Sequence, residues 1–162
     1  MQATTRPRPH RLVLPVVLLA LATVITAVSS LMLALPSLAR STGATATQLT
    51  WIVDAYALTF AALLLPGGAL GDRIGRRRTL LYGLAIFGLA AASVLLVDSP
   101  NGLIAIRAVL GLAAAAVMPA TLSTITSCFD DDQRPRAVAL WAAVAGASAV
   151  LGVLVAGLVL ER

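Results

Sequence analysis

The sequence predicts an all-α membrane protein, a bundle of five transmembrane helices. The 162 residues are 59% hydrophobic and only 12% charged, whereas ordinary soluble domains carry roughly 25% charged residues. The apolar residues are mostly small and aliphatic, because aromatic residues make up only 4% of the chain. Small side chains let helices approach one another closely in lipid. This composition therefore fits a bilayer better than the core of a soluble domain.

The spacing of the apolar runs gives the number of helices. A helix needs about 20 mostly apolar residues to cross a bilayer, and five segments of the sequence meet this requirement. Their approximate ranges are 12–35, 50–70, 79–97, 103–127 and 137–160. We expect each of them to be helical, because backbone polar groups in lipid must be satisfied within the segment. The longer polar connection is expected over 36–49, which is rich in Ser, Thr and Ala.

The first apolar segment, at about 12–35, follows an arm of residues 1–11 that contains Arg6, Arg8 and Arg11. A basic arm before an apolar run is also typical of a secretory signal peptide. The apolar region of a signal peptide is only 7–15 residues long, however, and this run continues well beyond that length. We therefore interpret the run as a transmembrane helix and the arm as a cytoplasmic extension.

The second and third segments are separated by a strongly charged stretch. From Gly68 to Arg78 it reads Gly-Ala-Leu-Gly-Asp-Arg-Ile-Gly-Arg-Arg-Arg. Gly71 and Gly75 permit a sharp reversal without a penalty from a Cβ atom. A plain loop that is held on the positive side of a membrane would explain the arginines, but not this order of glycine, leucine, aspartate and arginine. The stretch is therefore interpreted as a specific motif.

The charged side chains of this loop are expected to fix its position. Asp72 could accept hydrogen bonds from the amides of the third helix or pair with Arg76, and the arginines would hold the loop at an anionic inner leaflet. The residues of the motif are Gly68, Leu70, Asp72, Arg73, Gly75, Arg76, Arg77 and Arg78.

The fifth segment, at about 137–160, carries small residues at helical spacing. Gly152 and Ala156 are four positions apart, as are Ala142 and Gly146, and such pairs allow two helices to pack closely. Ordinary helix packing is a sufficient explanation for most of this stripe. The positions that we expect to pack are Gly146, Gly152 and Gly157.

The distribution of arginines predicts the orientation. With the N-terminus inside, the inner segments hold nine arginines and the outer segments hold two, while Arg107 falls within the fourth span and completes the twelve. An excess of Lys and Arg marks the cytoplasmic side of a membrane protein. We therefore expect a multi-pass protein of the cell (inner or plasma) membrane with a cytoplasmic N-terminus.

Two ionisable side chains fall inside the predicted spans. Asp54 lies about four positions into the second segment from the outer side, a depth of about 6 Å, and Arg107 lies at a similar depth in the fourth. An ionisable residue at membrane depth is a functional hypothesis by default, and a carboxylate can hold an organic cation or a proton. We predict a direct or water-bridged pair between them. Asp54 could instead reach water or cap its helix, and Arg107 could be a structural hydrogen-bond donor.

The sequence gives no support to several other functions. All 12 basic residues are arginines, and nearly all lie in loops between apolar spans, which argues against a nucleic-acid partner. One cysteine, Cys128, and one histidine, His10, are too few for a typical zinc site. There is neither a glycine-rich phosphate loop with a lysine nor a nucleophile motif. We therefore expect no enzyme activity, no metal and no cofactor.

The run from Gly68 to Arg78 resembles the signature loop between helices two and three of the major facilitator superfamily. Other runs agree with its fourteen-helix drug:proton antiporters, the quaternary-ammonium and multidrug efflux branch. Trp51 begins the run Trp-Ile-Val-Asp-Ala-Tyr-Ala-Leu, Arg107 begins Arg-Ala-Val-Leu-Gly, and Met118 begins Met-Pro-Ala-Thr-Leu-Ser. The small residues of the fifth segment resemble the antiporter motif of the same branch.

This resemblance implies a transporter that exports organic cations in exchange for protons. It makes Asp54 the cation or proton site, links Arg107 to proton transfer, and gives the loop from Gly68 to Arg78 the role of a conformational latch. The implied partners are the lipid bilayer, a small organic substrate such as a cation, and protons.

The resemblance is partial in two respects. Members of the family have about twelve or fourteen helices in two halves, with substrate bound between them, whereas this sequence resembles an N-terminal fragment that a C-terminal half or self-association would complete. Five positions of the family motifs are also changed, and three of them are polar in the family. The residues found there are Ala27, Met32, Leu110, Val153 and Ala156. The alternative function is a non-transporting membrane fragment or a helix-assembly partner.

Overall fold

The computed structural model describes residues 13–160, and within that range all regular structure is helical. The elements, in order, are α1 (Val13–Thr42), α2 (Ala46–Ile74), α3 (Arg76–Ser93), the 3-10 helix η1 (Val94–Leu96), α4 (Pro100–Cys128) and α5 (Arg134–Leu160). Five stretches, one in each long helix, are long and apolar enough to cross a membrane. The predicted all-α fold with five spans is confirmed. The predicted cytoplasmic arm, residues 1–11, lies outside the described residues.

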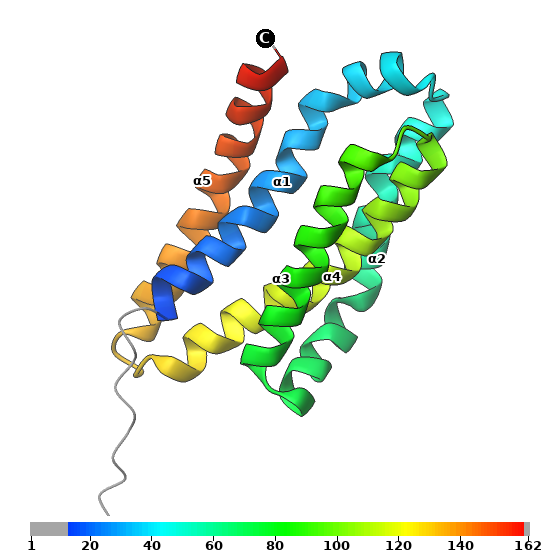
Figure 1. Cartoon of the computed structure of the whole chain (residues 1–162). Helices are drawn as coiled ribbons and strands as arrows, with labels where there is room; N and C mark the ends of the chain where they lie inside the picture. Colours follow the sequence, from blue (N-terminus) through cyan, green and yellow to red (C-terminus); the bar gives the residue numbers. More distant parts are fainter. Residues whose placement is uncertain (1–12, 161–162) are drawn as a thin grey trace, which may run out of the picture.

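Helix α1 extends further than the sequence indicated. We expected a helix as far as about residue 35 and a polar connection over 36–49, but α1 continues through Pro36 as far as Thr42. Proline removes one backbone hydrogen bond and bends a helix, but it does not have to end it. Figure 1 shows the last part of α1 turning away from the axis of its first part and towards the start of α2.

The connection between α1 and α2 covers only residues 43–45. Gly43 has a φ angle of 63°, the left-handed conformation that commonly ends a helix. Thr45 then caps α2: its hydroxyl accepts a hydrogen bond from the Gln48 amide at 3.3 Å, and the Gln48 side-chain oxygen accepts one from the Thr45 amide at 3.0 Å. This reciprocal arrangement is a capping box. Ser and Thr serve at helix ends as well as in loops, so composition alone overestimated the connection.

Helix α4 lies at the centre of the bundle. It packs along α2 and α3 and makes smaller contacts with α1 and α5, while α1 packs mainly along α5. Figure 1 shows α1 and α5 side by side, next to the group formed by α2, α3 and α4. Half of the residues in the most apolar part of α4 are buried, against 11–28% in the other spans. The other four helices therefore turn most of their apolar surface outward, as a protein surrounded by lipid requires.

Close contact between α2 and α4 depends on Gly111. A Cβ atom built on Gly111 would overlap the Thr59 hydroxyl and lie 2.5 Å from the Tyr56 carbonyl oxygen. The backbones can reach this distance only because no side chain stands between them. The crossing brings the segment around Tyr56 directly against the middle of α4, and this is where the predicted ionisable residues lie.

Candidate functional site

The charged loop is a one-residue reversal between α2 and α3. Helix α2 ends at Ile74 and α3 begins at Arg76, and Gly75 between them has φ 98° and ψ 134°. This backbone conformation is essentially restricted to glycine. The Gly75 amide donates to the Gly71 carbonyl at 3.1 Å, and the Gly75 carbonyl accepts from the Thr79 amide at 3.1 Å. The turn is therefore closed by hydrogen bonds to both helices.

Arg76 is the one arginine of the loop that turns inward. Its Nη1 donates to the Ser123 carbonyl oxygen at 3.1 Å, which ties the start of α3 to α4. The other charged side chains of the motif are exposed: Asp72, Arg73, Arg77 and Arg78. Within residues 13–160, no hydrogen bond or ion pair joins Asp72 to Arg76 or to the first amides of α3. Those expected contacts of Asp72 are therefore not formed, and the Arg76 side chain is directed at α4 instead.

The first residues of the motif, Gly68 and Leu70, lie in the last part of α2. A Cβ atom on Gly68 would be 3.6 Å from the Pro119 Cβ atom, an ordinary van der Waals distance. Gly68 therefore faces α4 without being required by the packing. The Leu70 side chain is 47% exposed, so it contributes little to the core of this chain.

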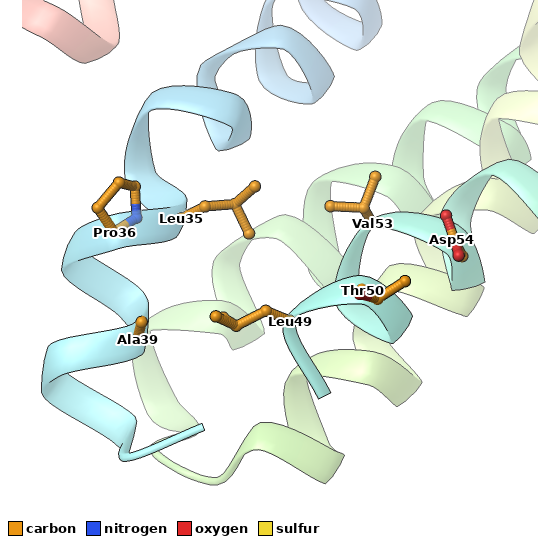
Figure 2. A pocket seen from close by; sticks show the side chains of 7 residues that line it. All are labelled: Leu35, Pro36, Ala39, Leu49, Thr50, Val53 and Asp54. Carbon is orange, nitrogen blue, oxygen red and sulfur yellow. The ribbon is translucent and has the colours of Figure 1, made fainter. Parts of the chain in front are cut away.

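Asp54 lies on the exposed side of α2, eight residues after Ala46, or about 12 Å along the helix axis. It lies at the rim of a groove of about 480 Å³ between α1 and α2. Figure 2 shows Asp54 at one end of the lining, with Leu35 and Leu49 pointing towards each other between the two helices. A cation with an apolar body fits a carboxylate beside such walls.

Within residues 13–160, no cluster of three or more His, Cys, Asp or Glu side chains could hold a metal ion.

Arg107 lies inside the bundle and is only 7% exposed. Its Nε donates to the Ile52 carbonyl oxygen at 3.0 Å, and its guanidinium carbon lies 4.9 Å from the centroid of the Tyr56 ring, within the range of a cation–π interaction. The Tyr56 ring is in turn stacked on Phe60, with 6.0 Å between the ring centroids. These partners of Arg107 were not predicted from the sequence. The four-residue spacing of Ile52 and Tyr56, which places both on one face of a helix, was the available signal.

The direct pair predicted between Asp54 and Arg107 is not formed in the structure. Arg107 meets the side of α2 that carries Ile52. Two residues along an α-helix correspond to a rotation of about 200°, so Asp54 lies on nearly the opposite side and lines the groove towards α1. Arg107 does reach the part of α2 that carries Asp54, but it meets the opposite side of that helix.

The small residues of α5 divide between two faces. A Cβ atom on Gly152 would lie 2.6 Å from the Thr26 carbonyl oxygen of α1, and nothing lies within 4 Å of one on Gly146. Ala156 is buried and Gly157 is half-buried, whereas Gly146 is exposed. Six residues separate Gly146 from Gly152, a rotation of about 240°. The expected packing therefore applies to Gly152 and its neighbours, and it is wrong for Gly146 within this chain.

Apolar helices joined by a tight charged reversal define a multi-pass membrane protein of the transporter class. Residues 17–162 match the family model of the Major Facilitator Superfamily. The chain belongs to this superfamily, and the resemblance inferred from the loop motif is confirmed. This is a family of transporters, in agreement with the expectation that the chain is not an enzyme.

Curated relatives carry names of drug resistance and efflux. The chain is 42% identical over 130 residues to the methyl viologen resistance protein SmvA of Salmonella typhimurium, which covers 80% of the chain and 26% of the relative. It is 42% identical over 163 residues to the multidrug efflux pump LfrA of Mycolicibacterium smegmatis, covering 99% and 32%. It is 43% identical over 123 residues to the methylenomycin A resistance protein of Streptomyces coelicolor, covering 75% and 26%. The chain thus spans about a quarter to a third of the length of these relatives.

Proposed function

We propose that the chain forms part of a proton-coupled efflux transporter for small organic cations in the cell membrane, with its N-terminus in the cytoplasm. The observation that carries this proposal is the Asp54 carboxylate, exposed at the rim of an apolar groove about 12 Å along α2. An ionisable group at membrane depth is energetically costly, so its presence there supports a functional role. The resistance and efflux named for the relatives support small organic compounds as substrates.

The proposed coupling depends on competition at one carboxylate. Ionised Asp54 attracts a cation whose apolar part packs against Leu35 and Leu49. Protonated Asp54 is neutral and no longer attracts the cation. Binding of a proton to Asp54 therefore favours release of the cation. Arg107 holds the neighbouring backbone at Ile52 against α4. In this proposal Arg107 positions the segment that carries Asp54 and does not pair with it directly.

The loop between α2 and α3 is proposed to act as the conformational latch. Gly75 is the only residue between the two helices, so the connection is short. The hydrogen bond from Arg76 to Ser123 attaches the start of α3 to α4. The exposed arginines, Arg73, Arg77 and Arg78, are then free to meet an anionic leaflet or a further part of the transporter. Their concentration on one side supports a cytoplasmic location for this loop.

Ethidium efflux from vesicles that contain the chain, driven by an imposed proton gradient, tests the proposal. Asp54→Asn keeps the size of the side chain but removes its charge, and opposite unit charges about 4 Å apart near a protein surface attract by roughly 4 kcal/mol before desolvation. We therefore expect proton-coupled efflux to fall by about tenfold or more. Asp98→Asn, which changes an exposed carboxylate in a loop, is the matched control and should leave efflux unchanged.

Two results would limit this proposal in different ways. Unchanged efflux in Asp54→Asn would contradict the role given to this carboxylate. No proton-dependent efflux by the unaltered chain would show that the chain does not transport on its own.

The second candidate function is helix assembly without transport. Large apolar side chains are strongly exposed on several helices, including Leu65 at 84%, Leu95 at 87% and Leu158 at 67%, and they could pack against another copy or other membrane helices. The mass of the protein in detergent separates the outcomes, because an oligomer of defined size supports assembly and a monomer does not.

A further inference from the structure

A second cavity, separate from the Asp54 groove, lies among α1, α2, α3 and α4 and has a volume of about 290 Å³. Among the described residues of its lining, Arg107 is the only charged one and Ser30 is the only other polar one. Apolar side chains make up the walls, among them Phe87 and Leu110. The described lining therefore combines one positive charge with apolar walls and contains no acidic group that would balance that charge.

Only part of the Arg107 guanidinium is used within the protein. Nε is bonded to the Ile52 carbonyl oxygen, and in the described part of the chain this is the only hydrogen bond of the side chain. Among the described residues, Nε of Arg134 is the one fully buried side-chain nitrogen or oxygen without a partner, so Nη1 and Nη2 of Arg107 are not completely buried. Arg107 lines the cavity, and its two terminal nitrogens are available to a ligand there.

The orientation of the guanidinium is already fixed. Its bond to Ile52 and its contact with the Tyr56 ring hold the planar group from two sides. Two parallel N–H groups match the two oxygens of a carboxylate, and the attraction between opposite charges is stronger in a medium of low dielectric constant than in water. A cation would meet an unbalanced positive charge in the same cavity.

We propose that this cavity binds a small amphipathic carboxylate, with the anionic group on the terminal nitrogens of Arg107 and the apolar body against Phe87 and Leu110. Ligand pockets usually have volumes of roughly 300–1,000 Å³, so the cavity fits a compact acid with one or two rings. Asp54 is not in its lining, which makes this site separate from the proposed cation site. The proposal concerns binding alone and does not depend on the efflux function proposed above.

Calorimetric titration of the purified chain in a nonionic detergent with 2-naphthoate tests the site. Two probes of the same shape serve as controls, 2-naphthylmethanol without charge and 2-naphthylmethylammonium with a positive charge. We expect saturable binding of one naphthoate per chain, at least tenfold weaker binding of the alcohol, and no binding of the ammonium. Arg107→Gln should weaken naphthoate binding at least tenfold. Arg107→Lys keeps the charge but loses the paired donors, so its naphthoate affinity should lie between those of Arg107→Gln and the unaltered chain.

A second variant tests the cavity without changing Arg107. Ala27 lines the cavity on α1 and is exposed, so Ala27→Phe narrows the space while the bond between Arg107 and Ile52 is kept. We expect this variant to lose naphthoate binding. Ala142→Phe, at an exposed position on α5, is the matched control and should bind as the unaltered chain does.

Three outcomes would overturn the proposal. The first is equal binding of naphthoate and its alcohol, and the second is unchanged naphthoate affinity in both Arg107→Gln and Ala27→Phe. The third is an anionic lipid retained by the unaltered chain in native mass spectrometry and lost in Arg107→Gln, together with no naphthoate binding after lipid removal. That result would assign the cavity to a lipid headgroup.

Discussion

Gly75 joins α2 to α3 with a backbone conformation, φ 98° and ψ 134°, that residues with a side chain rarely adopt. The two residues that follow Gly75 differ in their surroundings. Arg76 turns inward to Ser123, while Arg77 stays exposed. Residues that look equivalent in the sequence therefore have different physical tasks. Gly75 shapes the turn, Arg76 attaches it to α4, and Arg77 supplies surface charge.

Replacing Gly75 by alanine tests the importance of that conformation. Backbone strain of this kind amounts to about 1–3 kcal/mol, so Gly75→Ala should lower the free energy of unfolding by about this amount. Gly88→Ala is the control, because nothing lies within 4 Å of a Cβ atom there and alanine is the better helix former by up to about 1 kcal/mol. Unfolding in mixed detergent micelles, followed by circular dichroism, measures both changes. Equal effects would show that the turn does not require glycine.

At the scale of elements, the α2–α4 crossing carries both proposed binding groups. Arg107 reaches α2 from α4, and Asp54 lies on the other side of the same part of α2. Gly111 permits the close approach of the two backbones, because a side chain there would meet Thr59 and Tyr56. A change at this contact is therefore expected to alter both the groove and the cavity.

A comparison of two glycines tests this contact. Gly111→Ala adds a methyl group where there is no space, and overpacking of this kind costs about 1–3 kcal/mol. Gly146→Ala adds the same group where nothing lies within 4 Å, and it should be neutral or stabilising. The same unfolding measurement applies. A loss of stability in Gly146→Ala as large as that in Gly111→Ala would contradict the packing described for α2 and α4.

At the scale of the whole molecule, the connections lie at two opposite ends. Figure 1 shows the α2–α3 and α4–α5 connections at one end of the bundle and the α1–α2 and α3–α4 connections at the other. This alternation is what helices that cross a membrane in succession require. It separates the arginine-rich loop around Gly75 from the loop that contains Asp98.

Cysteine labelling of intact cells tests the proposed orientation. In a Cys128→Ser background, Arg77→Cys should react with a membrane-impermeant thiol reagent only after the cells are opened. Asp98→Cys, at the opposite end of the bundle, should react from outside. Both positions are exposed, so a difference in reactivity reports the side of the membrane. The reverse pattern would contradict a cytoplasmic N-terminus.

The sequence predicted the helices better than the contacts between them, and there is a physical reason for the difference. The ability to cross a bilayer depends on the length and hydropathy of one segment, so all five spans could be found from the apolar runs. The partner of Arg107 depends instead on how α4 is rotated against α2. These helices are apolar around most of their circumference, which leaves little pattern from which to infer that rotation. The expected depth in the membrane therefore suggested Asp54 as the partner of Arg107, whereas the structure places Ile52 and Tyr56 next to Arg107.

The central place of α4 has a consequence for biosynthesis. Helix α1 hardly touches α2 or α3, and α2 touches α3 only lightly, whereas α4 contacts all four of the other long helices. A ribosome that has made only the first three helices has therefore released segments with few partners among themselves. The bundle can close only after residues 100–128 have entered the bilayer. Until that moment the unfinished chain is most exposed to the proteases and chaperones that monitor membrane insertion.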